Sequence, residues 1–124
     1  MASAPKPVPF LETIDARVAL SKAGKIRISC PLAEDVRNYV GNMHGGVIAA
    51  IAEAAARAAL RCAHPKGKQS TIEMKLNYFR PIVKGEITAV ADLISGESTI
   101  CVANVELFDS AKNLAAAAIV TMQR

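Results

Sequence analysis

Hydrophobic residues alternate with polar ones along much of this chain, and in one stretch they run together. The alternation at positions 18, 20, 26, 28 and 30 has a period of two, which predicts a hairpin with its turn at residues 21–24. From Gly45 to about Ala63 almost every residue is Ala, Ile, Val or Leu, without proline. This composition predicts a helix that is apolar nearly all round, and such a helix is normally buried by other structure.

Four later segments have the pattern of strands. They span residues 70–79, 86–95, 99–108 and 114–122, with short turn-like breaks between them. The alanines at 115–118 are also compatible with helix, but Ile119, Val120 and Thr121 favour a strand. A hairpin, one buried helix and four strands together predict an α+β fold, in which an antiparallel sheet of about six strands curves around one central helix.

The length of 124 residues, with 52% hydrophobic and 21% charged residues, fits one domain with its own core. We predict that this domain spans residues 10–124 and begins with a short helix at 10–14. Residues 1–9 carry prolines at 5, 7 and 9 and are expected to form a loose arm, with no signal-peptide core. Charged residues interrupt the most apolar segment before it reaches the roughly 20 residues that a membrane span needs.

Charge and cysteine content narrow the classes of function. The net charge is +4, but Lys and Arg are scattered and aromatic residues make up only 4%, which favours a small phosphorylated ligand over nucleic acid. Cys30, Cys62 and Cys101 lie far apart and lack metal-ligand spacing, so the sequence indicates neither a disulfide framework nor a zinc site. We therefore expect a cytoplasmic protein that uses no metal and no other cofactor.

The segment just before the predicted helix has the composition of a catalytic turn. Residues 38–46 read Asn-Tyr-Val-Gly-Asn-Met-His-Gly-Gly, and the glycine pair opens the helix. Glycine lets the backbone approach a bound group closely, and the first N–H groups of a helix carry partial positive charge. The turn therefore has the features of an oxyanion site, which stabilises an oxygen that gains negative charge.

These residues resemble the hotdog-fold acyl-CoA thioesterases of the PaaI-like, or type II 4-hydroxybenzoyl-CoA thioesterase, group. The resemblance covers nearly the whole chain after residue 10. The matching elements are Asn38, the run 41–46, Glu53, and the strand segment 70–81 followed by Gly85. The resemblance implies the hotdog fold and an enzyme that hydrolyses an acyl- or aryl-CoA thioester to the free acid and CoA.

The resemblance also implies a role for each matching position. The Gly45 N–H and the Asn38 side chain would polarise the thioester carbonyl, and Glu53 would be the general base on water or the nucleophile. Thr71 would position the water, and His44 would orient the turn or contact the thioester. Thioester hydrolysis needs both an oxyanion site and an activated water, and the assigned residues would supply both.

Helix geometry predicts that two chains share each site. Gly45 and Glu53 are eight residues apart, so they lie roughly 12 Å apart along one helix and cannot reach the same carbonyl carbon. An antiparallel helix from a two-fold related chain would bring its own Glu53 beside this Gly45. We therefore predict at least a homodimer with two shared sites, each formed by Asn38, His44 and Gly45 of one subunit and by Glu53 and Thr71 of the other. The resemblance favours a homotetramer built as a dimer of dimers.

CoA carries phosphates, so cations near the site are candidates for binding it. The expected contacts are Gly46, Lys66, Lys68, Arg80, Lys84 and Gly96. The four cations lie in predicted loops or at strand ends, where they could pair with phosphate or simply form a solvated surface. Glu97, next to Gly96, would repel a phosphate unless it points away.

Each proposed catalytic position also has a plain structural explanation. Glu53 could form an ion pair with Arg57 one turn later. His44 could cap the helix, and the glycine pair could relieve crowding against the sheet. Thr71 could be present for its strand propensity.

Two other functions remain open from the sequence. A hotdog hydratase or dehydratase would act on enoyl or hydroxyacyl thioesters and would use His44 and Glu53 for proton transfer. A non-catalytic acyl-CoA-binding module would keep the fold without hydrolysis. The sequence has no extended hydratase motif, which disfavours the first alternative, and the presence of Asn38, Gly45 and Glu53 disfavours the second.

Overall fold

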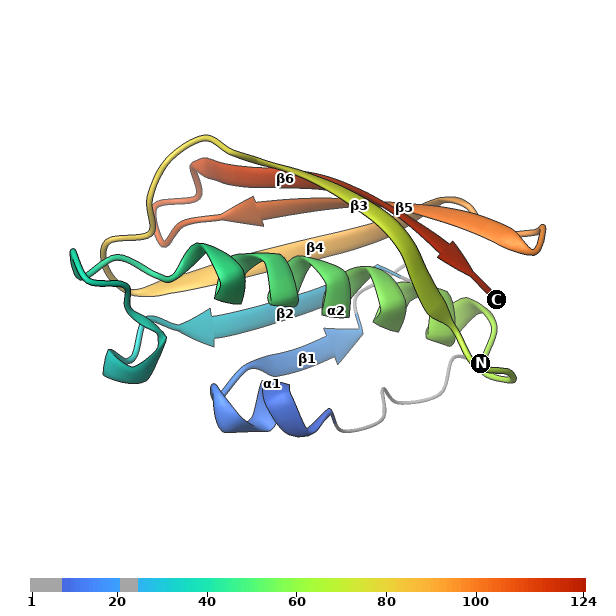
Figure 1. Cartoon of the computed structure of the whole chain (residues 1–124), viewed down its shortest axis with the longest axis horizontal. Helices are drawn as coiled ribbons and strands as arrows, with labels where there is room; N and C mark the ends of the chain where they lie inside the picture. Colours follow the sequence, from blue (N-terminus) through green and yellow to red (C-terminus); the bar gives the residue numbers. More distant parts are fainter. Residues whose placement is uncertain (1–7, 21–24) are drawn as a thin grey trace.

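The computed structural model describes residues 8–20 and 25–124, and it has the α+β architecture expected from the sequence (Figure 1). Six strands form one antiparallel sheet in the order β1-β2-β4-β5-β6-β3, with helix α2 lying against one face. The elements are α1 (Pro9–Thr13), β1 (Arg17–Leu20), β2 (Ile26–Pro31), the 3-10 turn η2 (Glu34–Val36), α2 (Gly45–Ala63), β3 (Ser70–Tyr78), β4 (Glu86–Ser95), β5 (Ile100–Phe108) and β6 (Leu114–Gln123).

The elements predicted from periodicity are confirmed. The long helix has its expected limits, and each of the four later strands ends within one residue of its expected position. The two strands of the expected hairpin pair antiparallel, with Val18 opposite Ile28, while the expected turn at 21–24 lies outside the described residues. Val8 and Pro9, which we had assigned to the arm, cap and begin α1, and Val8 packs against the core. Residues 1–7 of the expected arm lie outside the described residues.

Helix α2 supplies much of the core because its small residues allow a close approach to the sheet. Its buried residues are Ile48, Ile51, Ala52, Ala55, Ala56, Ala58, Ala59 and Leu60. Most of them are alanines, whose short side chains let the strands pack closely against the helix. The remaining side of α2 carries Glu53, Arg57 and Arg61, which are partly exposed. This charged side of the helix is therefore available for chemistry.

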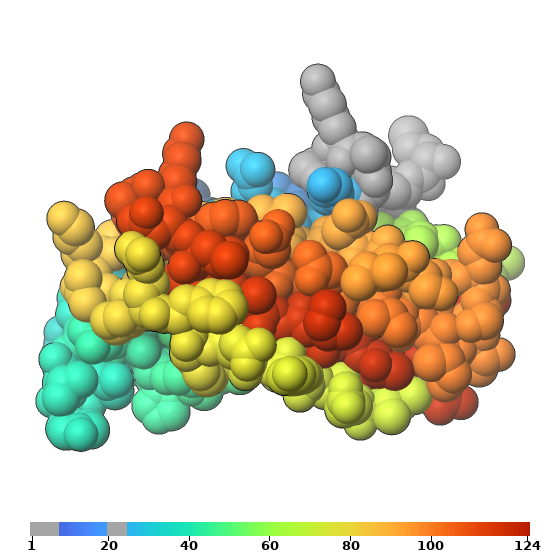
Figure 2. Space-filling view, turned by 90° about the horizontal axis from the view of Figure 1, so that it is seen from above, coloured from blue at the N-terminus to red at the C-terminus, as the bar shows by residue number. Residues whose placement is uncertain are grey.

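Strand β3 forms one edge of the sheet, and in the described part of the chain its only partner strand is β6. Figure 2 shows it in yellow and yellow-green along the lower margin of the molecule. Most of its side chains are exposed, including Ile72 and Tyr78. A long, open and partly apolar edge is a template for pairing with another strand.

Within residues 8–20 and 25–124, no helix is long and apolar enough to cross a membrane. The same residues contain no group of three or more His, Cys, Asp or Glu side chains placed to hold a metal ion. The absence of a cofactor therefore stays a prediction from the sequence.

Candidate active site

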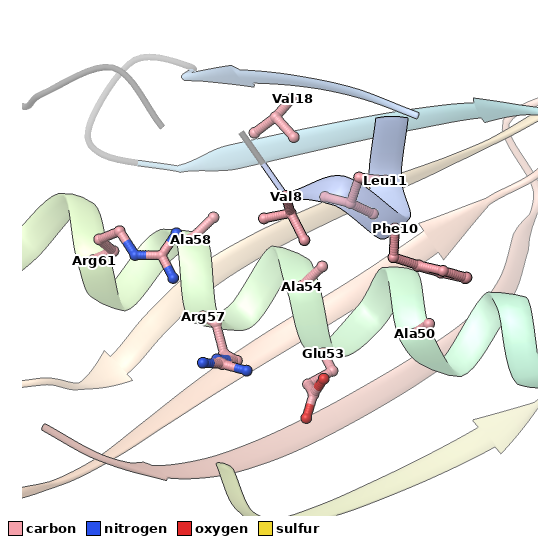
Figure 3. A pocket seen from close by; sticks show the side chains of 10 residues that line it. All are labelled: Val8, Phe10, Leu11, Val18, Ala50, Glu53, Ala54, Arg57, Ala58 and Arg61. Carbon is pink, nitrogen blue, oxygen red and sulfur yellow. The ribbon is translucent and has the colours of Figure 1, made fainter. Parts of the chain in front are cut away.

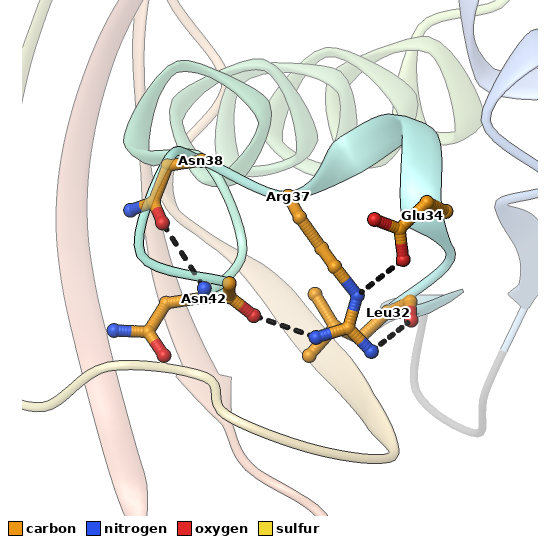
Figure 4. A network of polar contacts seen from close by, with 6 residues as sticks. Leu32, Glu34, Arg37, Asn38 and Asn42 are labelled. Atoms are coloured by element: carbon orange, nitrogen blue, oxygen red, sulfur yellow. Dashed lines mark hydrogen bonds and ion pairs between the residues drawn. The ribbon is translucent and has the colours of Figure 1, made fainter.

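The loop before α2 holds Asn38 in a fixed orientation (Figure 4). The Oδ1 atom of Asn38 accepts hydrogen bonds from the backbone N–H groups of Val40 at 3.1 Å and Asn42 at 3.0 Å. Because both neighbours are donors, the side-chain oxygen must face the loop, and the Nδ2 amide turns away from it. Among the described residues Nδ2 has no acceptor, so it remains able to donate to a bound carbonyl oxygen.

Arg37 braces this loop from the opposite side. Its guanidinium donates to the carbonyl oxygens of Gly41 at 2.6 Å and Leu32 at 3.4 Å, and its Nε lies 3.4 Å from the carboxylate of Glu34 (Figure 4). Gly41 has a φ of +89°, a conformation that glycine adopts without steric cost. Arg37 is not predictable from the sequence, since no pattern marks an arginine whose partners are backbone carbonyls.

The start of α2 leaves one backbone donor free. His44 is the N-cap, and its Nδ1 accepts from the Gly46 N–H at 2.9 Å. The N–H groups of Val47 and Ile48 donate to the His44 carbonyl oxygen. Within the described part of the chain the Gly45 N–H has no acceptor, as expected for the first turn of a helix. It is therefore an unpaired donor at the positive end of the helix dipole.

Asn38 and Gly45 lie in one cleft with a volume of about 380 Å³. The cleft is lined by Asn38, Asn42, Met43, Gly45, Ile48, Tyr78, Phe79, Arg80 and Pro81. The Tyr78 hydroxyl donates to the Gly45 carbonyl oxygen at 2.6 Å, which ties the helix start to the end of β3. The two predicted oxyanion donors are thus brought together, in a cleft whose other walls are largely apolar.

Glu53 lies in a different cavity, of about 360 Å³, between α1, β1 and the outer side of α2. Its lining residues are Val8, Phe10, Leu11, Val18, Ala50, Glu53, Ala54, Arg57, Ala58 and Arg61. Figure 3 shows the side chains of Glu53 and Arg57 extending from the side of α2 opposite α1. Among the described residues, the two cavities share no lining residue. Within one chain the structure does not bring Glu53 together with Asn38 and Gly45.

The ion pair between Glu53 and Arg57 that the sequence allowed is not formed. Arg57 instead donates from Nη2 to the carbonyl oxygen of Gln69 at 3.1 Å. In the described part of the chain, Glu53 has neither an ion-pair partner nor a hydrogen bond. Its carboxylate is therefore free to act on a bound group.

Thr71 lies near the start of β3 and has a buried hydroxyl. Its Oγ1 is one of three buried side-chain polar atoms that lack a hydrogen-bond partner among the described residues. It sits where the pairing of β3 with β6 is interrupted between Thr71 and Glu73. Leaving a buried hydroxyl without a partner costs about 1–3 kcal/mol. A bound water or a substrate atom would remove this cost.

The residues expected to contact CoA do not form one group within a single chain. Arg80 lines the cleft of Asn38, and Gly46 lies at the start of α2. Lys66 and Lys68 follow the far end of this 19-residue helix, about 28 Å away at 1.5 Å per residue. Gly96 lies at that far end too, because its carbonyl oxygen is 2.5 Å from Nε2 of His64, the C-cap of α2. Lys84 is exposed in the loop between β3 and β4.

The buried thiol of Cys30 takes no part in this site. Burial, with smaller contributions from the carboxylates of Asp15, Asp35 and Glu86, raises the pKa of Cys30 to about 11. Its Sγ lies 3.5 Å from the carbonyl oxygen of Ile14. A thiol with this pKa is protonated near neutral pH and is a poor nucleophile.

The capping role of His44 leads to a testable expectation. Replacing His44 with alanine removes the acceptor for the Gly46 N–H and should lower the free energy of unfolding by about 1 kcal/mol. His44→Asn restores a cap and should recover most of the stability, with kcat within a few-fold of the parent protein. Urea unfolding and steady-state kinetics on the two variants would measure this. Equal and large losses of kcat in both, with unchanged stability, would instead indicate proton transfer by His44.

The comparison with known sequences decides the family. A sequence model of the thioesterase superfamily matches residues 40–116, which run from the Asn38 loop into β6. The chain belongs to the thioesterase superfamily. Its function is therefore that of a hydrolase of the thioesterase type.

Individual relatives agree with this assignment. Acyl-coenzyme A thioesterase 13 of Mus musculus is 26% identical over 103 residues, which cover 81% of this chain and 74% of that protein. The structure of thioesterase HI1161 from Haemophilus influenzae has a TM-score of 0.87 at 21% identity, covering 92% of this chain and 80% of that one. The phenylacetic acid degradation protein PaaI from Thermus thermophilus has a TM-score of 0.84 at 24% identity, covering 94% and 99%. These two structures establish the hotdog fold.

Proposed function

We propose that this thioesterase hydrolyses acyl-CoA thioesters to a free acid and CoA, at sites shared between two chains. The observation that carries the proposal is the pair of free donors, Asn38 Nδ2 and the Gly45 N–H, in one cleft at the start of α2. A thioester carbonyl oxygen seated there would gain two hydrogen bonds and the helix dipole as it becomes an oxyanion. The relative named acyl-coenzyme A thioesterase 13 supports CoA as the thiol.

In the proposed reaction, Glu53 of the partner subunit takes a proton from water as the water oxygen attacks the carbonyl carbon. The C=O electrons move to oxygen, and Asn38 and Gly45 stabilise the resulting oxyanion. When this tetrahedral intermediate collapses, the C–S bond breaks and CoA leaves as a thiolate, which takes the proton from Glu53. Water supplies the OH of the acid and the proton of the thiol, so the atoms balance.

Thr71 supports a bound water as the nucleophile, with Glu53 as its base. The buried and unpartnered Oγ1 of Thr71 can donate one hydrogen bond and accept others. A water held by this hydroxyl would be positioned for the base to act on.

The separation of the two cavities supports assembly as a dimer. Gly45 and Glu53 lie roughly 12 Å apart along α2, and they line different cavities. Pairing two copies through the open edge of β3 would place their α2 helices side by side and antiparallel. Each Glu53 would then approach the Gly45 of the other chain. The same arrangement would bring Lys66 and Lys68 of one chain toward Arg80 of the other. A further pairing into a dimer of dimers is part of the proposal.

A thiol-release assay over a panel of saturated acyl-, aryl- and enoyl-CoA thioesters tests the function. We expect free CoA from at least one of the saturated or aryl thioesters. Tight binding without thiol release from any of them would favour a non-catalytic binding module. Loss of the enoyl double bond without thiol release would favour a hydratase.

A further inference from the structure

The cavity that contains Glu53 has a distinct composition, which we consider as a site of its own and call the α1–α2 cavity. Ala50, Ala54 and Ala58 lie one helical turn apart and form its floor. Apolar side chains from α1 and β1, among them Phe10 and Val18, form its wall. Such a cavity suits an extended hydrocarbon chain lying along α2.

Two arginines interrupt this apolar lining. Arg57 and Arg61 both line the cavity, and neither forms an ion pair with any described residue. Among the residues that the structure describes, Arg57 has a single hydrogen bond, to the Gln69 carbonyl oxygen, and its buried Nε has no partner. Figure 3 shows the Arg61 side chain lying along the helix toward Ala58. Half-buried guanidinium groups beside apolar walls are costly unless an anion pairs with them.

We propose that the α1–α2 cavity holds the acyl group and selects thioesters whose acyl chain ends in a carboxylate, with Arg61 as its principal partner. The inference rests on the proposed function, because Glu53 marks where the reacting carbonyl lies. Guanidinium groups bind carboxylates through two parallel charge-assisted hydrogen bonds. A neutral chain of equal length would fill the same apolar floor but leave the arginines unpaired.

The position of Arg61 sets the length of the acyl chain. Along α2, Ala58 lies about 7.5 Å and Arg61 about 12 Å beyond Glu53. An extended acyl chain forms a zigzag of carbon–carbon bonds of about 1.5 Å. Roughly eight carbons therefore span the distance from Glu53 to the region of Ala58. A much shorter diacid would bring its carboxylate beside the Glu53 carboxylate, where like charges repel. The matched probes are therefore suberoyl-CoA, which ends in a carboxylate, and octanoyl-CoA, which does not.

Binding is measured by calorimetric titration of both thioesters into Glu53→Gln protein, in which hydrolysis is suppressed. We expect suberoyl-CoA to bind at least about 10-fold more tightly than octanoyl-CoA, and the ratio to fall to about twofold or less when Arg61→Met is added. Arg61→Lys should retain part of the ratio. Arg17→Met, which removes an exposed arginine outside the cavity, should retain all of it.

Three results would overturn the inference: equal affinity for the two thioesters, a ratio unchanged by Arg61→Met, or no binding of either. A fourth is that Arg61→Met weakens the binding of free CoA as much as it weakens the binding of suberoyl-CoA. That result would place Arg61 on a CoA phosphate. Thiol release from the two thioesters by parent protein is measured separately. If thiol is released equally from the two thioesters, the carboxylate site is refuted but the proposed thioesterase function is not. A binding preference without release from any thioester refutes the proposed reaction alone.

Discussion

Replacing Glu53 with glutamine is expected to lower kcat for thioester hydrolysis by about 10²- to 10⁴-fold, the usual contribution of a positioned general base. Glutamine has nearly the same shape but cannot accept the proton of the attacking water. Among the described residues Glu53 has no ion-pair partner and no hydrogen bond, so the fold loses no contact. KM should therefore change much less than kcat, and the melting temperature should stay close to that of the parent protein.

Thiol release under saturating substrate measures this effect. Glu106→Gln serves as the matched control, because Glu106 is an exposed glutamate on β5 outside both cavities. It should leave kcat unchanged. A Glu53→Gln protein with more than about a third of the parent kcat would remove Glu53 from the role of base.

Replacing Asn38 with aspartate is expected to lower kcat by about 10²- to 10³-fold, as loss of one oxyanion donor does elsewhere. The new carboxylate can still accept from the N–H groups of Val40 and Asn42, so the loop should keep its shape. It cannot donate to the thioester oxygen, and it adds negative charge where the oxyanion forms. Both changes raise the energy of the transition state more than the energy of the bound substrate.

Asn42→Asp separates the loss of a donor from the addition of charge. Asn42 lines the same cleft, and its substitution introduces the same charge while leaving the Asn38 amide in place. Steady-state kinetics should show a much smaller loss for Asn42→Asp than for Asn38→Asp. Equal losses would mean that charge in the cleft, rather than the Asn38 donor, controls the rate.

Much of the fold could be predicted because it rests on local periodicity. In the apolar stretch Gly45–Ala63 and in the alternating strands, the local pattern of apolar residues predicts which side chains are buried. The structure confirms the limits of these elements to within one residue. The resemblance supplied the candidate site residues Asn38, Gly45 and Glu53. The structure then showed that the first two share a cleft and that the third lies elsewhere.

Other features depend on contacts between distant parts of the chain, which leave no periodic signal. The Tyr78 hydroxyl bonds the Gly45 carbonyl oxygen across 33 positions. Arg37 braces the loop through backbone carbonyls, which any residue type presents. The wall that Phe10 contributes to the α1–α2 cavity exists only because the fold brings α1 near the outer side of α2. These contacts could not be predicted from spacing along the sequence.

The sharing of each site between two chains is tested most directly by mixing two inactive variants. Glu53→Ala and Asn38→Ala proteins, carrying different affinity tags, are unfolded and refolded together, and heterodimers are isolated through both tags. In each heterodimer one site receives Asn38 from one chain and Glu53 from the other, and the second site lacks both. We expect each variant alone to be nearly inactive and the heterodimer to recover about half of the parent activity per dimer. Verified heterodimers that remain as inactive as the two parent variants would contradict a shared site.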